Sequence, residues 1–442
     1  MTMGLTVAQK ILGRVVGRQV EPGERVEVVP DSLLANEMLG MVIVPKVDQI
    51  GAKQIDREIA RRTMCFMDHG GVGATPLYVG IHQSMRAFCQ THDIDIEEVG
   101  AGICHLLFAE KGGALPGGFV LGTDSHTVNA GAYNTLASAG GASEILKLMV
   151  TGSCHYTVPH TVRIELTGSL PQWVYSKDLI LYLIGEHRAR FAGGRAMEYT
   201  GEGVGCMSVT ARATASNMAV EAGAVAGIFP CDEILREHVE ARFPQAEHHW
   251  EGVASDPDAT YADRIDVDLS SLEPIVACPH APENIRPVRE VDAEVDQVFI
   301  GSCTNAKYED LEIVAKILNG RKVRPLTIVV PGTHGIYREC VRNGLPEVFL
   351  EAGCRVMEPG CHACFGGPGG LLGPGQRAAS TTNRNFIGRM GGDTSTEVFL
   401  MSPALAAATA AAGKIAHPDD LPATKPTVDL AARSQLRIME QR

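Results

Sequence analysis

The 442-residue sequence predicts an α/β protein of about three domains with mostly parallel sheets. A chain of this length exceeds one hydrophobic core, because domains average roughly 150 residues. Short apolar runs alternate with helical patterns, and strands that are joined through helices pair in parallel with right-handed crossovers. Glycine is abundant, at 48 residues, which favours the tight turns and close backbone approaches of α/β proteins with binding loops.

The first predicted domain spans residues 1–155. Its N-terminal segment should form an amphipathic helix, with one apolar face made of Val7, Ile11, Leu12, Val15 and Val16. Short apolar runs predict strands at 41–44 and 119–121. Glycine-rich turns, DHGGVGAT at 68–75 and SAGGAS at 138–143, separate these elements.

The second predicted domain, residues 156–275, begins with a strand at 162–166 (VRIEL), and an apolar helix follows at 178–187 (DLILYLIGEH). Residues 240–295 are expected to form a linker, because their hydrophobic periodicity is weak and prolines are frequent. These prolines are Pro274, Pro279, Pro282 and Pro287.

The third predicted domain, residues 276–442, is a further α/β unit. Strands are expected at 298–300, at 326–330 and near 354–357, and the alanine-rich run at 403–413 predicts a buried helix. Asn305 is expected to cap another helix. The apolar face of that helix consists of Leu311, Val314, Ile317 and Leu318.

The amino-acid composition excludes some classes of function. Apolar residues make up 45% and charged residues 21%, which is typical of soluble globular proteins. The net charge of −13 argues against a nucleic acid or an anionic membrane as the main partner. No run approaches the roughly 18 apolar residues of a membrane span. Lys10 and Arg14 interrupt any secretory pattern, so we expect a cytoplasmic protein, with a transit peptide as the alternative.

Twelve cysteines in such a chain indicate reduced thiols or metal ligation rather than disulfides. Cys303, in FIGSCTN, lies between a predicted strand and a helix N-terminus, where partial positive charge favours a thiolate. Other cysteines stand in apolar or helical surroundings and are expected to be core residues. They are Cys65, Cys89, Cys104, Cys206 and Cys340.

Cys361 and Cys364 form a CxxC pair, which alone fits a redox dithiol, half of a zinc site or part of an iron–sulfur site. The GGPGG that follows argues against a thioredoxin-like helix, and the lack of a second CxxC argues against structural zinc. Cys303 would make a third ligand; Cys354 is a possible fourth, although its strand-like context favours the core. Three thiolates suit an iron–sulfur cubane with one open iron, which acts as a Lewis acid.

Polar residues also gather in glycine-rich turns. A carboxylate beside an imidazole can orient the ring and raise its pKa, which suits a general acid. Two arginines five residues apart in NRNFIGR can each bind a carboxylate bidentately, with phosphate binding or structural pairing as the alternatives. The clusters are Asp68-His69, His105, Asp124-Ser125-His126 and Asn383-Arg384 with Arg389.

Several segments resemble the signature segments of the aconitase superfamily, across nearly the whole chain. They are GICH (102–105), GTDSHT (122–127), EYTGEG…SNMAVEAGA (198–224), GSCTNA (301–306), PGCHAC (359–364) and STTNRNFIGRMG (380–391). The segments 279–288 and 395–416 are similar to those of the large subunits of 3-isopropylmalate dehydratases and homoaconitases.

The resemblance implies roles for individual residues. It implies that Asp68 and His69 protonate a departing hydroxyl, and that His105, Asp124 and His126 form the network around the iron-bound hydroxyl or water. It implies one [4Fe–4S] cluster per subunit, ligated by Cys303, Cys361 and Cys364, with Glu221 near the labile iron. Asn217, Asn305 and Asn383 would neighbour the cluster, and Ser125, Arg384 and Arg389 would bind substrate. The spacing of Asn217 and Glu221 predicts one helical face.

The resemblance also implies three aconitase-like domains around a cluster-binding cleft, without the swivel domain that carries a serine base. A small swivel-domain subunit is therefore the expected partner, in a heterodimer or heterotetramer. The expected reaction is dehydration or isomerisation of a small 2-hydroxy di- or tricarboxylate, first 3-isopropylmalate, then homocitrate, dimethylmalate or citramalate. The competing classes are an RNA-binding protein and a zinc or redox protein.

Three segments depart from the family pattern: NEMLG at 36–40, GGVGATPL at 70–77 and CHACF at 361–365. Substrate contacts through residues 36–40 are therefore not carried over.

Overall fold

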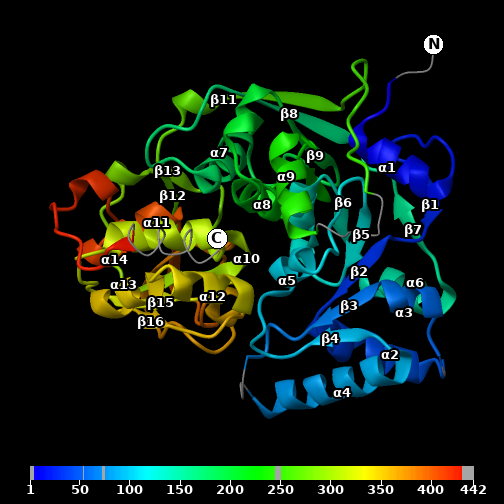
Figure 1. Cartoon of the computed structure of the whole chain (residues 1–442), viewed down its shortest axis with the longest axis horizontal. Helices are drawn as coiled ribbons and strands as arrows, with labels where there is room; N and C mark the ends of the chain where they lie inside the picture. Colours follow the sequence, from blue (N-terminus) through cyan, green and yellow to red (C-terminus); the bar gives the residue numbers. More distant parts are fainter. Residues whose placement is uncertain (1–3, 53, 72–74, 244–249, 431–442) are drawn as a thin grey trace, which may run out of the picture. The chain divides into compact units, whose positions relative to one another are not determined.

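The computed structural model describes residues 4–52, 54–71, 75–243 and 250–430 (Figure 1). Residue contacts divide the chain into two compact units. The first unit consists of Met1–Val99, Cys104–Leu170 and Arg188–Ser271. The second consists of Gly100–Ile103, Pro171–His187 and Leu272–Arg442. The division into three domains at 155/156 and 275/276 stays a prediction.

A five-stranded parallel sheet lies in the first unit, in the order β4-β3-β2-β5-β6. Its strands are β2 (Ser32–Ala35), β3 (Thr63–Phe66), β4 (Asp95–Glu97), β5 (Phe119–Gly122) and β6 (Leu136–Ala139). The helices of this region are α1 (Val7–Val16), α2 (Val44–Gln49), α3 (Arg57–Arg62), α4 (Pro76–His92), α5 (Cys104–Glu110) and α6 (Ala142–Thr151). In Figure 1, α4 runs beside the sheet edge, where it contacts β4.

The strand predicted at 41–44 is wrong: this run is helical, in a short π-helix (Leu39–Ile43) that continues into α2. Ile43 and Val47, four residues apart, are buried, whereas Met41 is 45% exposed. Burial at every fourth residue is the pattern of a helix. A short apolar run does not show whether its residues repeat with the period of a helix or of a strand. The predicted strand at 119–121 is confirmed as β5, and the predicted N-terminal helix as α1, which Thr6 caps.

The first unit also holds a four-stranded parallel sheet, in the order β10-β9-β8-β11. Its strands are β8 (Thr161–Thr167), β9 (Ala196–Thr200), β10 (Ala226–Ile228) and β11 (Asp263–Asp268). Helices α8 (Val209–Asn217) and α9 (Glu233–Arg242) accompany it, and β1 (Arg25–Val28) pairs antiparallel with β7 (Cys154–Thr157). The strand predicted at 162–166 is confirmed as β8.

The linker expected at 240–295 is wrong in part. Its residues DRIDVD form β11, which alternates between exposed and buried positions and pairs with β8 along six residues. Two further strands, β12 (Ile275–Ala277) and β13 (Ile285–Pro287), follow in the proline-rich part. Prolines are tolerated there because they flank the strands or end the edge strand β13. Residues 244–249 of the expected linker lie outside the described residues.

The second unit is built on a seven-stranded sheet, in the order β13-β12-β18-β17-β14-β15-β16. The strands from β18 to β16 are parallel, and β12 is antiparallel to both its neighbours. The further strands are β14 (Gln297–Ile300), β15 (Leu326–Val329), β16 (Arg355–Val356), β17 (Arg377–Ser380) and β18 (Glu397–Leu400). The helices are α7 (Ser176–His187), α10 (Ser302–Asn305), α11 (Tyr308–Leu318), α12 (His334–Arg342), α13 (Leu345–Ala352) and α14 (Pro403–Ala412).

The strands and helices predicted for this unit are confirmed, including the apolar face of α11. The predicted cap is wrong, because Lys307 precedes α11 while Asn305 ends α10. The Asn305 side chain instead donates a 2.9 Å hydrogen bond to Asp310 in the first turn of α11.

Mostly parallel sheets confirm the predicted α/β class. The carboxyl ends of parallel strands are the usual place for a binding site. In the first unit the ends of β3, β2 and β5 meet side by side, and in the second unit those of β14 and β17 do. Every described helix is too short or too polar to span a lipid bilayer.

Candidate active site

Acid–base side chains gather at the carboxyl ends of β3 and β5 in the first unit. Asp68 and His69 follow β3, and Nδ1 of His69 lies 2.7 Å from Oδ1 of Asp68. The second oxygen of Asp68 accepts a 2.8 Å hydrogen bond from the backbone N–H of Cys104. The Asp68 carboxylate is therefore fixed from two sides, and it orients the His69 ring.

Two carboxylates favour the protonated form of the His69 imidazole. Burial by itself lowers the pKa of His69, but the carboxylates of Asp68 and Glu37 outweigh it and hold that pKa well above its usual value. An imidazolium carries a proton on each ring nitrogen; Nδ1 of His69 faces Asp68, and Nε2 lies 3.9 Å from Oδ2 of Asp124. A general acid at neutral pH needs a raised pKa of this kind.

Asp124, after β5, joins the other two histidines. Its Oδ1 lies 3.0 Å from Nε2 of His105 and accepts a 2.8 Å hydrogen bond from the backbone N–H of His126. Burial opposes the ionisation of Asp124, yet the bonds from His105 and His126 hold its pKa well below the usual value. Nε2 of His126 in turn lies 3.1 Å from Oε1 of Glu221.

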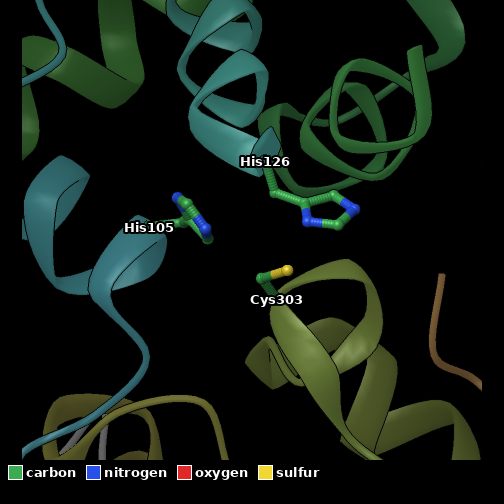
Figure 2. A group of neighbouring side chains, drawn as sticks. All are labelled: His105, His126 and Cys303. Atoms are coloured by element: carbon green, nitrogen blue, oxygen red, sulfur yellow. The ribbon is translucent and has the colours of Figure 1, made fainter. Parts of the chain in front are cut away.

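His105 comes from α5, and His126 comes from the 3₁₀ segment Ser125–Tyr133. Their rings lie edge to face, with centroids 6.2 Å apart (Figure 2). Nδ1 of His105 is buried and has no hydrogen-bond partner among the described residues. A buried polar atom without a partner is costly, so this nitrogen is available to a ligand.

Other predicted residues of the first unit lie around this cluster. Ser125 Oγ is 3.4 Å from Nδ1 of His126. Asn217 is fully buried at the end of α8, and a 3₁₀ turn (Met218–Val220) separates it from the buried Glu221. The helical face predicted for Asn217 and Glu221 therefore spans a change from α-helix to 3₁₀ helix, and both side chains are buried.

Three buried thiols lie on short helical turns of the second unit. Cys303 lies on α10 (Figure 2), while Cys361 and Cys364 are joined by a 3.1 Å backbone hydrogen bond across one 3₁₀ turn. The thiol of Cys364 donates a 3.2 Å hydrogen bond to Ser302 Oγ, which lies 3.8 Å from Sγ of Cys303. These contacts bring Cys303 and Cys364 to the same hydroxyl group.

Asn383 joins the same two thiols. Its Nδ2 lies 3.6 Å from Sγ of Cys303, and its Oδ1 lies 3.8 Å from Sγ of Cys364. An amide N–H that points at a sulfur stabilises the thiolate form, in which cysteine binds metal. Three soft, buried sulfur donors with polar neighbours fit an iron–sulfur group.

Backbone strain marks these turns. Ser302 (φ 81°) and His362 (φ 48°) adopt the left-handed conformation although neither is glycine. The His362 ring is held by backbone carbonyls, with Nε2 2.9 Å from Glu358 O, so it fastens the CxxC loop. Cys354 belongs to the apolar core, where burial raises the pKa of its thiol to about 12, and this favours a core role over a fourth ligand.

The predicted arginines follow β17 on a well-anchored loop. Both are half-buried, and the Nε of Arg389 is buried without a hydrogen-bond partner among the described residues. The fully buried Lys177 of α7 donates hydrogen bonds through Nζ to the carbonyls of Thr381 and Thr382. Lys177 thus holds the backbone just before Asn383 and Arg384.

Arg384→Lys is expected to lower kcat/KM by roughly five- to 150-fold, or about 1–3 kcal/mol of transition-state binding. Lysine keeps the charge but lacks the planar fork that binds a carboxylate through two parallel hydrogen bonds. The measurement compares the steady-state kcat/KM of the variant with that of the wild-type protein. Arg377→Lys, at an exposed position of β17 that pairs with Glu397, is the matched control. An unchanged kcat/KM in Arg384→Lys would remove this residue from substrate binding.

Sequence reasoning did not identify four residues of these clusters. Glu37 and Asn36 follow β2 and contact His69 and Asp124, respectively. Ser302 and Lys177 support the thiol loops. The position of Glu37 at the end of a strand was a usable signal, but β2 was not predicted. Residues 72–74 of the divergent segment at 70–77 lie outside the described residues.

The first unit holds a histidine beside two carboxylates, and the second holds three buried thiols. These features define a class: enzymes that combine a thiolate-bound metal group with acid–base chemistry. The family model "Aconitase family (aconitate hydratase)" matches residues 79–294 and 284–413. The chain belongs to the aconitase family.

Relatives match along almost the whole chain. A 3-isopropylmalate dehydratase large subunit from Thermoanaerobacter pseudethanolicus is 42% identical over 426 residues, which are 95% of this chain and 100% of the relative. The protein of the same name from Syntrophus aciditrophicus is 40% identical over 428 residues, with the same coverage. A Thermococcus kodakaraensis aconitase X structure matches with TM-score 0.47 and 10% identity over 86% of this chain and 89% of its own. That likeness is too distant to carry a conclusion.

Family membership confirms the predicted aconitase-type hydro-lyase and implies an iron–sulfur cofactor.

Proposed function

We propose that the chain is the large subunit of a hydro-lyase that removes water from 3-isopropylmalate. The observation that supports this substrate is the 42% identity, over the full length of the relative, to a 3-isopropylmalate dehydratase large subunit. Homocitrate, dimethylmalate and citramalate are the alternative substrates. A small swivel-domain subunit is the proposed partner, because the relatives are named as large subunits.

Cys303, Cys361 and Cys364 would hold one [4Fe–4S] cluster, with Asn217, Asn305 and Asn383 as its neighbours. When bound, a cluster with three protein ligands supplies a Lewis acid at its open iron. The support on this chain is the buried thiol set and the polar contacts of Ser302 and Asn383 to Cys303 and Cys364.

The proton steps fall to the chain's own side chains. His69 would give the Nε2 proton to the departing hydroxyl, so that the C–O bond breaks and water leaves. Asp68 holds Nδ1 and stabilises the imidazolium before transfer. The electron pair of the C–H bond on the adjacent carbon forms the double bond, while a base of the partner subunit takes that proton.

The remaining predicted residues orient the reactants. His105, Asp124 and His126, extended by Glu221, form a hydrogen-bonded row that would hold the water in place. Arg384, Arg389 and Ser125 would bind the substrate carboxylates. A bidentate arginine contact neutralises the charge of a carboxylate and also fixes its orientation. The substrate would then be bound in the orientation that the reaction needs.

The test uses the chain purified without oxygen in complex with its cognate small subunit. Four candidate substrates are compared: 3-isopropylmalate, citramalate, dimethylmalate and homocitrate. The ultraviolet absorbance of the conjugated alkene product follows the reaction. We expect kcat/KM for 3-isopropylmalate to exceed the others by roughly tenfold or more, since each misplaced methylene costs about 10–200-fold. Preference for another acid would reassign the substrate, and no turnover of any would refute the proposal.

A further inference from the structure

Glu37 is a buried carboxylate beside His69 that no predicted role includes. One oxygen, Oε1, accepts hydrogen bonds from the backbone N–H groups of His69 (2.9 Å) and Gly70 (3.2 Å). Nε2 of His82 lies 3.2 Å from the same oxygen. The other oxygen, Oε2, lies 3.5 Å from Nδ1 of His69. Glu37 therefore contacts both the backbone and the ring of His69.

The fold explains this convergence. Glu37 follows β2, which lies between β3 and β5, so its side chain emerges between the strand ends that carry His69 and Asp124. His82 reaches Glu37 from α4. Gly70 is required for the close approach, because a Cβ there would lie 2.7 Å from atoms of both His82 and Tyr78.

We propose that Glu37 is a positioning residue that fixes the backbone and the ring of His69 for proton donation, and that His82 holds Glu37 in place. This inference rests on the proposed function, in which His69 is the acid. A buried carboxylate needs donors, and three N–H groups supply them here. Since an ionised carboxylate only accepts, the His82 nitrogen that faces it carries the proton.

The charge of Glu37 is part of this arrangement. Burial by itself raises its pKa, but hydrogen bonds from His69 and His82 outweigh this and hold the pKa of Glu37 below its ordinary value. Asp68 and Glu37 thus place two carboxylates around one imidazolium, with 2.7 Å and 3.5 Å separations from Nδ1. Asp68 provides the direct hydrogen bond to the ring, while Glu37 binds the backbone N–H of His69 and lies beside its ring.

The Glu37→Gln variant tests whether the negative charge of Glu37 is needed in addition to its hydrogen bonds to the backbone. The amide oxygen of glutamine can still accept from the His69 and Gly70 N–H groups, but its NH₂ group then faces Nδ1–H and displaces the ring. We expect kcat of the two-subunit holoenzyme to fall about ten- to hundred-fold with KM little changed, because the acid is misplaced while substrate contacts remain. Hydrogen exchange of residues 68–70 should stay slow in Glu37→Gln and become faster in Glu37→Ala.

His82→Phe keeps the ring volume and removes the donor. Its kcat should fall by a smaller factor, roughly two- to tenfold, again without a change in KM. Gln83→Ala, at the exposed neighbouring position of α4, is the matched control and should behave as wild type. Iron, sulfide and Tm are measured for every variant.

Failure of this inference differs from failure of the proposed function. If the wild-type holoenzyme does not turn over any candidate acid, the proposed function fails. If the wild type is active and Glu37→Gln has wild-type kcat, the role of Glu37 is refuted. A kcat loss that only tracks loss of folded or iron-loaded protein would also refute it. Wild-type kcat in His82→Phe would refute the role of His82.

Discussion

Replacing Cys303, Cys361 or Cys364 with serine is expected to abolish iron and acid-labile sulfide binding and, with it, all dehydratase activity. Serine has nearly the same size as cysteine, but its hydroxyl is a hard, weakly acidic ligand that does not replace a thiolate on iron. Because a cluster with three protein ligands already has one open iron, loss of a further ligand should leave no stable cluster.

The measurement is iron and sulfide content per chain and the broad visible absorbance of thiolate–iron charge transfer, all under anaerobic conditions. Cys206→Ser is the matched control, since this thiol is exposed and lies outside the three-cysteine set. Full cluster content in all three ligand variants would refute the assignment. Stoichiometric zinc without sulfide in the wild type would instead favour a zinc site.

The elements that the sequence predicted correctly share a simple physical property: their pattern of apolar residues is clear within one segment. The strand β14 is an apolar run before a glycine turn, and α11 shows its apolar face at helical spacing. The strand prediction for residues 41–44 was wrong because four consecutive apolar residues fit a strand as well as a buried helix. The strand β11 was missed because only two of its six residues are buried. Cys206, expected in the core, is exposed because its 3₁₀ segment buries Gly203 and Val204 and turns Cys206 outward.

The site residues also differ in whether a local sequence pattern identifies them. Residues within a recognisable motif, such as Asp124 or Cys361, were identified from the sequence alone. Glu37 and Lys177 were not predicted because their relevance depends on contacts 32 and 204–205 residues away in the chain. In isolation a buried lysine on an apolar helix gives no sign that it binds the carbonyls before Asn383. Such supporting residues can be recognised only from the three-dimensional structure, in which segments far apart in the sequence lie together.

The chain without its small subunit is expected to be inactive as a dehydratase, although it should still bind iron and sulfide. Dehydration must protonate the leaving hydroxyl and remove a proton from the adjacent carbon, so the proposed reaction needs both an acid and a base. In the proposed mechanism His69, which Asp68 and Glu37 contact, supplies the acid. The relatives that this chain covers end to end are named large subunits, which implies that another subunit completes their enzyme.

A missing general base costs about 10²–10⁴-fold in rate. We therefore expect at least a hundredfold lower turnover for the chain alone, and recovery when the cognate small subunit is titrated in. Activity should reach its plateau at one small subunit per chain, while iron and sulfide contents stay constant throughout the titration. A chain with all three Cys303, Cys361 and Cys364 replaced by serine should gain no activity on mixing. Robust turnover by the 442-residue chain, shown by mass spectrometry to be free of a second subunit, would contradict this division of labour and place the base within the chain itself.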